Sequence, residues 1–270
     1  MPAPKKSPDA GFTIIELIVA LGIFLVIIGA AFTLLGTSQQ RYQSDSQVLN
    51  SFQEARLGMD QIVRDVNDAG FPPPSSFTAS AAPFNAIYFA STPFAWSPGY
   101  TSNTPCIVGT SSCATPSDID LIVETNITPQ NPSSPVFWVR YQLQGQTLYR
   151  GVAQKTAFHD AAIDTSQPGV MVPYVQNVMN HASPAQIAQF QASFPNMFPS
   201  GNQVPIFTYY CDTSTGPLPC TSPLVINTSP QNIRSVAITL IVMSALPDPQ
   251  SGQARLVELN GLGRRINPNQ

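Results

Sequence analysis

The stretch FTIIELIVALGIFLVIIGAAFTLLG, from Phe12 to Gly36, contains a single charged residue and decides the fold of this chain. As a helix it is about 37 Å long, enough to cross a hydrocarbon core of about 30 Å. Lys5 and Lys6 precede this stretch, and the next basic residue is Arg41. Because basic residues stay on the cytoplasmic side, we expect a cytoplasmic N-terminus and an extracytoplasmic C-terminal region.

The charged residue within this stretch is Glu16. The apolar run exceeds the 7–15 residues or so of a secretory signal, so hydropathy alone favours a simple signal anchor. A carboxylate inside an apolar helix, however, costs about 2.5–3.5 kcal/mol at the bilayer centre and needs a partner. Cleavage between Gly11 and Phe12 would create an amino group on Phe12, four residues before Glu16 and on the same helical face. The amine and the carboxylate can then neutralise each other, within one chain or between neighbours.

The residues around this junction resemble the processing site of type IV prepilins and type II secretion pseudoprepilins. The similar residues are Lys5-Lys6, followed by Gly11-Phe12-Thr13-Ile14-Ile15-Glu16-Leu17. The resemblance implies that a prepilin peptidase cleaves after Gly11 and methylates the amine of Phe12, and that Glu16 guides docking into a growing filament. It also implies other pilins or pseudopilins and an inner-membrane assembly platform as partners.

The helix is predicted to continue beyond the membrane, because no proline lies between Phe12 and Pro72. It should end near Asp68, with Gly70 as the terminator and the following prolines preventing its resumption. An apolar stripe recurs at steps of three and four residues, which favours packing on a sheet over a coiled-coil seam. Its members are Val48, Phe52, Ala55, Met59, Ile62, Val66 and Ala69. The charged residues predicted to form the opposite, solvated face are Glu54, Arg56, Asp60, Arg64, Asp65 and Asp68.

Further resemblances concern the kind of pilin. The helix lacks the kinking proline that major pilins usually carry, which favours a minor component present in few copies. The stretch Gln53–Asp60, with Arg64-Asp65-Val66 and Ala69-Gly70, resembles PilW-like minor pilins. Residues Val139–Leu143 and Thr147–Arg150 resemble a hairpin of both PilW-like pilins and J-type pseudopilins, so the hairpin does not separate the two systems.

The remainder of the chain is predicted to be a β-rich head. Its segments are rich in β-branched and aromatic residues and alternate with connections rich in Pro, Ser and Gly. The expected strands are Ile119–Glu124, Val136–Leu143, Thr147–Val152, Ile206–Tyr210, Ile233–Met243 and Ala254–Leu259. Gln144-Gly145-Gln146 should join the second and third of these in a hairpin, and a short helix is expected around Pro184–Phe194.

The four cysteines form two close pairs, Cys106 with Cys113 and Cys211 with Cys220. Short loops within proline-rich sequence favour two local disulfides, which implies an oxidising compartment. A zinc site is the alternative, but the chain has no C-x-x-C, and neither histidine lies within a few residues of a cysteine. The sequence therefore predicts two disulfide loops and no metal site.

Composition argues against several other functions. Charged residues make up only 10% of the chain and the net charge is -3. Lys155 is the one lysine outside the first six residues, so nucleic acid is not expected as a main partner. The chain has no G-x-S-x-G elbow, P-loop or dinucleotide-binding turn. His159-Asp160 is only an adjacent pair, so we predict neither an enzyme nor a cofactor.

Three further features of the sequence have a simpler explanation than a functional site. Asp118 and Asp120 are too few to complete the six to eight or so oxygen ligands of calcium, and a cluster at a strand start explains them better. Two sequons, beginning at Asn126 and Asn227, match a pattern that is frequent by chance in such a polar chain. The aromatic residues that suggest either an adhesive surface or core packing are Trp96, Tyr100, Phe194 and Phe198, and core packing is favoured.

The combined prediction is an α+β protein of type IV pilin-like fold. Residues 1–11 are expected to be a cleaved leader, and residues 12–36 the membrane-spanning and filament-core part of the helix. Residues 37–70 are its extracytoplasmic half. Residues 71–270 form the head, whose antiparallel sheet packs against that half of the helix. The expected function is a minor pilin that primes or caps a pilus, held in the inner membrane by contact with lipid before assembly. The alternatives are a minor pseudopilin of type II secretion and a membrane-anchored adhesin that enters no filament.

Overall fold

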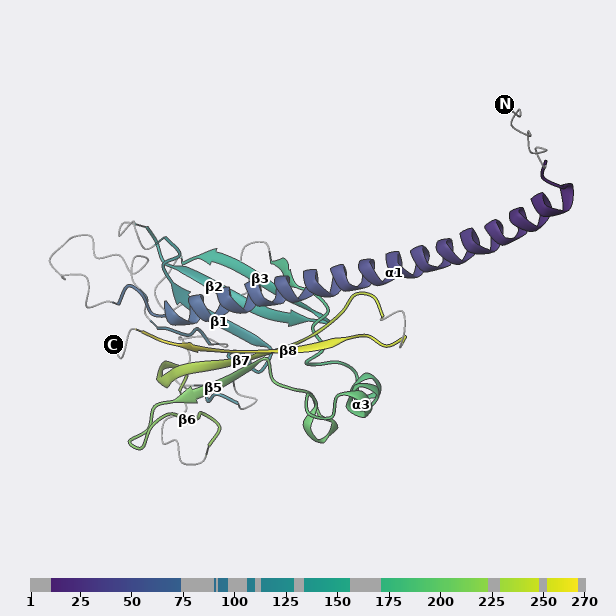
Figure 1. The fold of residues 1–270 in the computed structure, drawn as a ribbon. Helices are drawn as coiled ribbons and strands as arrows, with labels where there is room; N and C mark the ends of the chain where they lie inside the picture. The colour runs from purple at the N-terminus through teal and green to yellow at the C-terminus, as the bar shows by residue number, and fades with distance from the viewer. Residues whose placement is uncertain are drawn as a thin grey trace, which may run out of the picture.

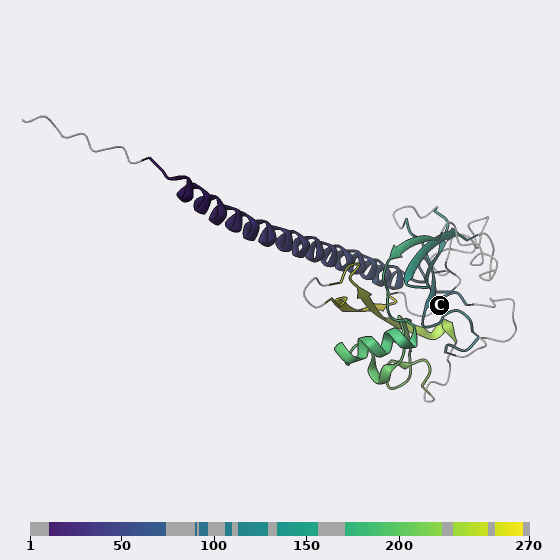
Figure 2. The ribbon, with the colours of Figure 1, turned by 90° about the vertical axis from the view of Figure 1, so that its right-hand side faces the viewer.

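The computed structural model describes residues 11–73, 90, 92–96, 106–109, 113–128, 134–155, 171–222, 229–247 and 252–266. Its dominant element is helix α1, Ile14–Asn67, which is 54 residues and therefore about 81 Å long. The N-terminal half of α1 projects away from the head, and the C-terminal half lies along it (Figures 1 and 2). The helix is continuous and ends one residue before the predicted limit.

Both ends of α1 are closed by local hydrogen bonds. At the N-terminus, Thr13 and Glu16 form a capping box, in which each side chain accepts a hydrogen bond from the backbone N–H of the other residue. At the C-terminus, the N–H of Asp68 donates to the carbonyl of Arg64. Gly70 then adopts a φ of 83°, which a side chain would disfavour, and the chain turns away into Phe71.

The described part of the head contains two antiparallel sheets rather than a single one. The first has the order β1-β2-β3-β4 and the second the order β6-β5-β7-β8. The strands of the first sheet are β1 Asp120–Thr125, β2 Phe137–Gln144, β3 Thr147–Gln154 and β4 Val172–Val175. Those of the second are β5 Phe207–Cys211, β6 Leu218–Pro219, β7 Ile233–Met243 and β8 Leu256–Arg264. The remaining elements are helix α3, Pro184–Ser193, and the 3₁₀ turns η3, Pro199–Gly201, and η4, Pro230–Asn232.

Most of these elements agree with the sequence-based expectations. Six strands begin within two residues of their predicted starts, and α3 lies where a short helix was expected. The hairpin between β2 and β3 turns through Gly145 and Gln146, and Gly145 has a φ of 61°. Strands β4 and β6 were not predicted, because each is short and contains a proline, which is normally confined to sheet edges. Both are edge strands in the observed order.

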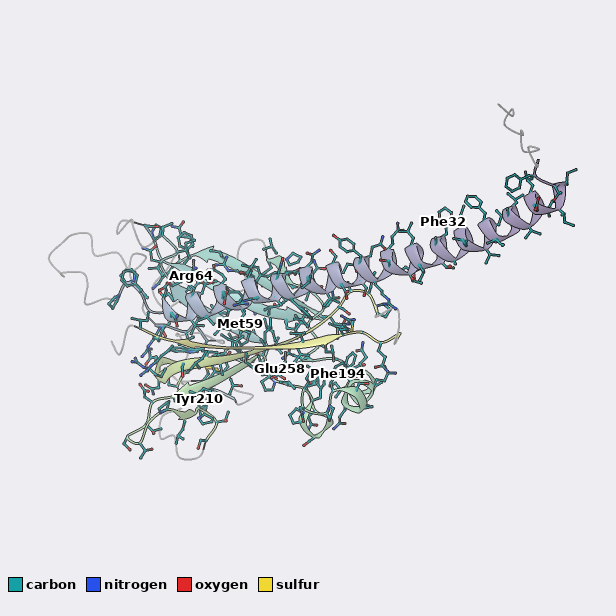
Figure 3. The ribbon with its side chains drawn as sticks, in the orientation of Figure 1. Phe32, Met59, Arg64, Phe194, Tyr210 and Glu258 are labelled. Carbon is teal, nitrogen blue, oxygen red and sulfur yellow. A yellow bond between two sulfur atoms is a disulfide. The ribbon has the colours of Figure 1, made fainter. Side chains whose placement is uncertain are left out.

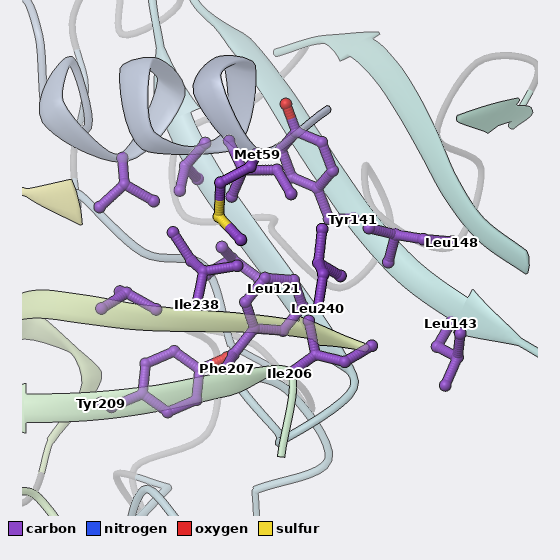
Figure 4. Packing of buried hydrophobic residues seen from close by; sticks show 14 of the residues in the cluster. Met59, Leu121, Tyr141, Leu143, Leu148, Ile206, Phe207, Tyr209, Ile238 and Leu240 are labelled. Carbon is purple, nitrogen blue, oxygen red and sulfur yellow. The ribbon is translucent and has the colours of Figure 1, made fainter. Parts of the chain in front are cut away.

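The apolar stripe of α1 fills the space between the two sheets. Figure 4 shows Met59 of α1 beside Tyr141 of the first sheet, with Leu121 of that sheet and Ile238 and Leu240 of the second below it. Six of the seven predicted stripe residues are buried, and Phe52 is half-buried. This confirms that the stripe packs on sheets and is not a coiled-coil seam.

Three glycines allow the helix to approach the strands closely. A Cβ added to Gly263 of β8 would lie 2.6 Å from Cβ of Val66, and one added to Gly261 would lie 2.6 Å from Sδ of Met59. On the helix itself, a Cβ on Gly58 would lie 2.5 Å from a methyl group of Val175 in β4. The missing side chains at these positions set how closely α1 packs on the head.

One expectation about α1 was wrong. Asp65 was placed on the solvated face, but only 6% of the residue is exposed. It lies beside the stripe, where the first sheet covers it. The other charged residues assigned to that face, Glu54, Arg56, Asp60, Arg64 and Asp68, are exposed, as predicted; Arg64 is labelled in Figure 3.

Candidate assembly and processing site

The N-terminal half of α1 presents apolar side chains that the head does not cover. Phe12 is 89% exposed and Ile14 81%, and the large apolar residues that follow as far as Leu35 are also exposed, except Ile28, which is half-buried. Figure 3 shows Phe32 on this bare part of the helix. Within the described residues, α1 is long and apolar enough to cross a membrane. Such a surface requires lipid or other apolar helices around it.

Glu16 lies in the first turn of this bare helix. Its Oε2 accepts hydrogen bonds from the backbone N–H and from the hydroxyl of Thr13, each at 2.9 Å. These local donors hold the carboxylate at the helix N-terminus, where the helix dipole also favours a negative charge. The carboxylate is therefore positioned near the place where cleavage after Gly11 would create an amine on Phe12.

Gly11 has no packing role in the described structure. It is exposed, and a Cβ built on it would meet nothing within 4 Å. Its backbone does not have the positive φ that favours glycine at Gly70 or Gly145. The fold of the described residues therefore does not require a glycine at position 11.

A buried polar cluster joins the far end of α1 to the first sheet. The hydroxyl of Tyr141 in β2 donates to Oδ2 of Asp65, and Arg150 of β3 lies 3.1 Å from the same oxygen. Nε of Arg150 also donates to the Tyr141 hydroxyl at 3.0 Å. Burial, together with the negative charge of Asp65, raises the pKa of Tyr141 well above 10. The cluster links the helix to β2 and β3. Neither the apolar stripe nor the spacing of charged residues in the sequence predicts this buried cluster.

The acidic residues considered for calcium face different partners. Asp120 pairs with Arg140 at 2.6 Å and accepts from Gln142, whereas Asp118 lies 3.0 Å from His181. Interaction with the His181 ring lowers the pKa of Asp118. Within the described part of the chain, no three His, Cys, Asp or Glu residues gather in a way that could hold a metal ion. The two aspartates therefore interact with separate partners and do not converge on one site.

The structure brings both cysteine pairs to disulfide distance. The Cα atoms are 4.7 Å apart in Cys106–Cys113 and 4.9 Å apart in Cys211–Cys220. The first pair packs with Trp96, and the second belongs to the main core. Trp96 and Phe198 are buried, which favours core packing over an adhesive surface. Tyr100, His159-Asp160, Asn227 and residues 1–10 of the predicted leader lie outside the described residues.

Comparison with known proteins bears on the N-terminal segment. Residues 6–32 match the family model of the prokaryotic N-terminal methylation motif. No curated protein and no solved structure matches the chain. The motif supports a type IV prepilin-like, class III signal, and the long helix on antiparallel sheets is consistent with the pilin fold.

The signal supports a type IV pilin- or pseudopilin-like precursor, and the apolar helix supports anchoring in a membrane. The motif implies processing by a prepilin peptidase and assembly with other pilins, and it indicates a structural subunit. The match spans the predicted junction between Gly11 and Phe12 and the bare part of α1 as far as Phe32, and it does not extend to the head.

Proposed function

We propose that this protein is a minor pilin-like subunit that is cleaved by prepilin peptidase and incorporated into a type IV pilus, where it primes or caps the filament. The observation that carries the proposal is the bare apolar half of α1, preceded by a matching processing junction. The absence of a kinking proline before Pro72 and the resemblance to PilW-like proteins support a minor subunit.

Each part of the site has a role in this proposal. Cleavage after Gly11 yields an amine on Phe12 that the peptidase methylates. During assembly the amine of one subunit and Glu16 of a neighbour neutralise each other, because both lie among apolar helices with little water. The apolar half of α1 leaves the lipid and packs against the same segment of other subunits. The head remains outside the membrane, where the cysteine pairs oxidise.

The processing step is tested by replacing Gly11 with leucine. The bulky side chain should prevent cleavage, because Gly11 is not required by the fold and its small size is then a property read by the peptidase. The mature species on a gel should be replaced by one heavier by the mass of the leader. Normal processing of the Gly11→Leu protein would contradict the assignment of the cleavage site.

The assembly step is tested at Glu16. Glu16→Ala should leave cleavage intact but reduce pilus number, because the charge that pairs with the Phe12 amine is lost. Glu16→Gln is the matched control, since glutamine keeps acceptors for Thr13 but removes the charge. If charge pairing is the function, both variants should fail alike, whereas wild-type pilus number in Glu16→Gln would show that only the helix cap matters.

A pseudopilin of type II secretion is the second candidate, favoured by the same N-terminal match. Deletion of the gene separates the two functions. Loss of surface pili with normal export of secreted proteins supports the pilus assignment, and the reverse pattern supports the pseudopilin. An adhesin outside any filament would be left uncleaved by prepilin peptidase.

A further inference from the structure

Lys155 and Glu124 form a fully buried pair in the head. Both side chains are 0% exposed, and Nζ of Lys155 contacts Oε1 of Glu124. Glu124 lies on β1 and Lys155 directly follows β3, with β2 between these strands. The backbone N–H of Lys155 donates to the carbonyl of Val136, and this hydrogen bond holds the residue after β3 beside the start of β2. The amine and the carboxyl are thus positioned by the sheet itself.

The two groups lie in an apolar part of the head that excludes water. Nζ of Lys155 lies 5.8 Å from the centre of the Trp138 ring, and Trp138 packs in a buried cluster with Ala95 and Ile122. Taking both charges out of water is costly, and transfer of one proton from the ammonium to the carboxylate removes both charges. That transfer leaves a nucleophilic amine beside a carboxylic acid.

The other carboxyl oxygen has a fixed donor. The backbone N–H of Thr92 donates to Oε2 of Glu124 at 3.0 Å. Attack of an amine on Cδ would place negative charge on this oxygen. A preorganised N–H in a site that excludes water stabilises such charge, as in the oxyanion holes of acyl transfer.

From this arrangement we propose that Lys155 and Glu124 condense into an intramolecular isopeptide bond. The lone pair of neutral Nζ attacks Cδ of the protonated carboxyl group, and the Nζ–Cδ bond forms. The Cδ–Oε1 bond breaks, and Oε1 leaves as water with its own proton and one proton from the amine. The step is a dehydration that needs no oxidant, reductant or other reactant.

The product ties β1 covalently to the segment after β3. It replaces a buried ion pair by a neutral amide whose oxygen keeps the Thr92 hydrogen bond, and exclusion of water protects it from hydrolysis. The bond would stiffen the first sheet of the head, independently of whether the protein enters a pilus or a pseudopilus.

Mass spectrometry of the natural, membrane-extracted protein tests this proposal. After reduction and denaturation, the mass of the protein should be lower by one water than the mass calculated from its sequence. The N-terminal peptide, identified separately, fixes where the mature chain begins for that calculation. Trypsin should not cut after Lys155, because the amine is an amide, but should still cut after nearby Arg150. The peptides that contain Glu124 and Lys155 should be recovered as one branched species. A full-sequence mass with cleavage after Lys155 overturns the proposal.

Lys155→Arg provides the matched variant. A guanidinium preserves the charge but is a poor nucleophile, so this variant should show the full sequence mass and separate peptides. Persistence of the one-water deficit in Lys155→Arg places the dehydration elsewhere and also overturns the proposal. The wild-type measurement stands by itself if the variant fails to accumulate.

Discussion

At the level of single residues, the charged groups of this protein are of two kinds: some are exposed to solvent and others are buried beneath a sheet. Asp65 and Arg64 are adjacent in the sequence, yet Arg64 is exposed whereas Asp65 contacts Tyr141 and Arg150 beneath the first sheet. A buried carboxylate requires donors that replace water, and here they come from two strands far away in the sequence. The cluster is therefore a specific joint between α1 and the head.

The joint predicts the effect of Tyr141→Phe. Loss of the hydroxyl removes hydrogen bonds to Asp65 and Arg150, which still contact each other, so unfolding free energy should fall by about 1–2 kcal/mol. Urea unfolding of the detergent-extracted protein, followed by tryptophan fluorescence, measures this loss. Tyr42→Phe is the control, because Tyr42 is exposed on the same helix. Equal stability of the two variants would contradict a joint at Tyr141.

The same residue predicts a dependence on alkaline pH. The pKa of Tyr141 in the folded protein lies well above the ordinary value of 10.0, because burial disfavours the phenolate. The neutral phenol therefore stabilises the fold below about pH 10, and this contribution is lost as pH rises through the folded pKa. Tyr141→Phe should lose less stability between neutral pH and about pH 11 than the wild type. Some loss remains, since burial also raises the pKa of Tyr209.

At the level of elements, the contact between α1 and β8 depends on missing side chains. Gly261 and Gly263 face the helix, and a Cβ on either would lie 2.6 Å from an atom of Met59 or Val66. The two contacts differ in kind. Sδ lies far along the flexible Met59 side chain, whereas Cβ of Val66 is fixed to the helix backbone and cannot move by itself.

This difference predicts unequal costs for two alanine substitutions. Gly263→Ala should destabilise the protein by about 1–3 kcal/mol, because either the strand or the helix must shift. Gly261→Ala should cost less, because Met59 can adopt another rotamer. Thermal unfolding of both variants in the same buffer shows which substitution lowers the stability more. A larger loss for Gly261→Ala would contradict the close approach of Val66 to β8.

At the level of the whole molecule, the protein has two parts with opposite requirements. The head buries its own core between two sheets and the second half of α1, whereas the first half of α1 exposes nearly all its apolar side chains. The head covers its own apolar core, but the bare helix needs lipid or neighbouring subunits. Transfer of the bare helix from one apolar environment to the other is the physical basis of the proposed assembly.

The orientation of the two parts is a prediction at this scale. With Lys5 and Lys6 in the cytoplasm, protease added to the periplasmic face of intact spheroplasts should digest the head and leave a membrane-protected fragment that contains Phe12–Gly36. A cytoplasmic marker protein should survive as the control. Protection of the head in intact spheroplasts, with digestion only after lysis, would reverse the proposed topology.

The sequence by itself determined the bare helix, its matching signal and the stripe from Val48 to Ala69. Helical spacing and bilayer length are local properties, which a run of neighbouring residues fully expresses. The same holds for the hairpin around Gly145 and for six of the strands, where β-branched and aromatic residues follow one another.

Only the tertiary structure decided which polar residues lie inside. Asp65, Glu124 and Lys155 look like surface residues in the sequence, because their partners come from other strands and no local pattern indicates the covering layer. The division of the head into two sheets, and the short edge strands β4 and β6, likewise depend on pairing between distant segments. Burial is a property of the whole packing arrangement, so it becomes visible only when the strands are placed around α1.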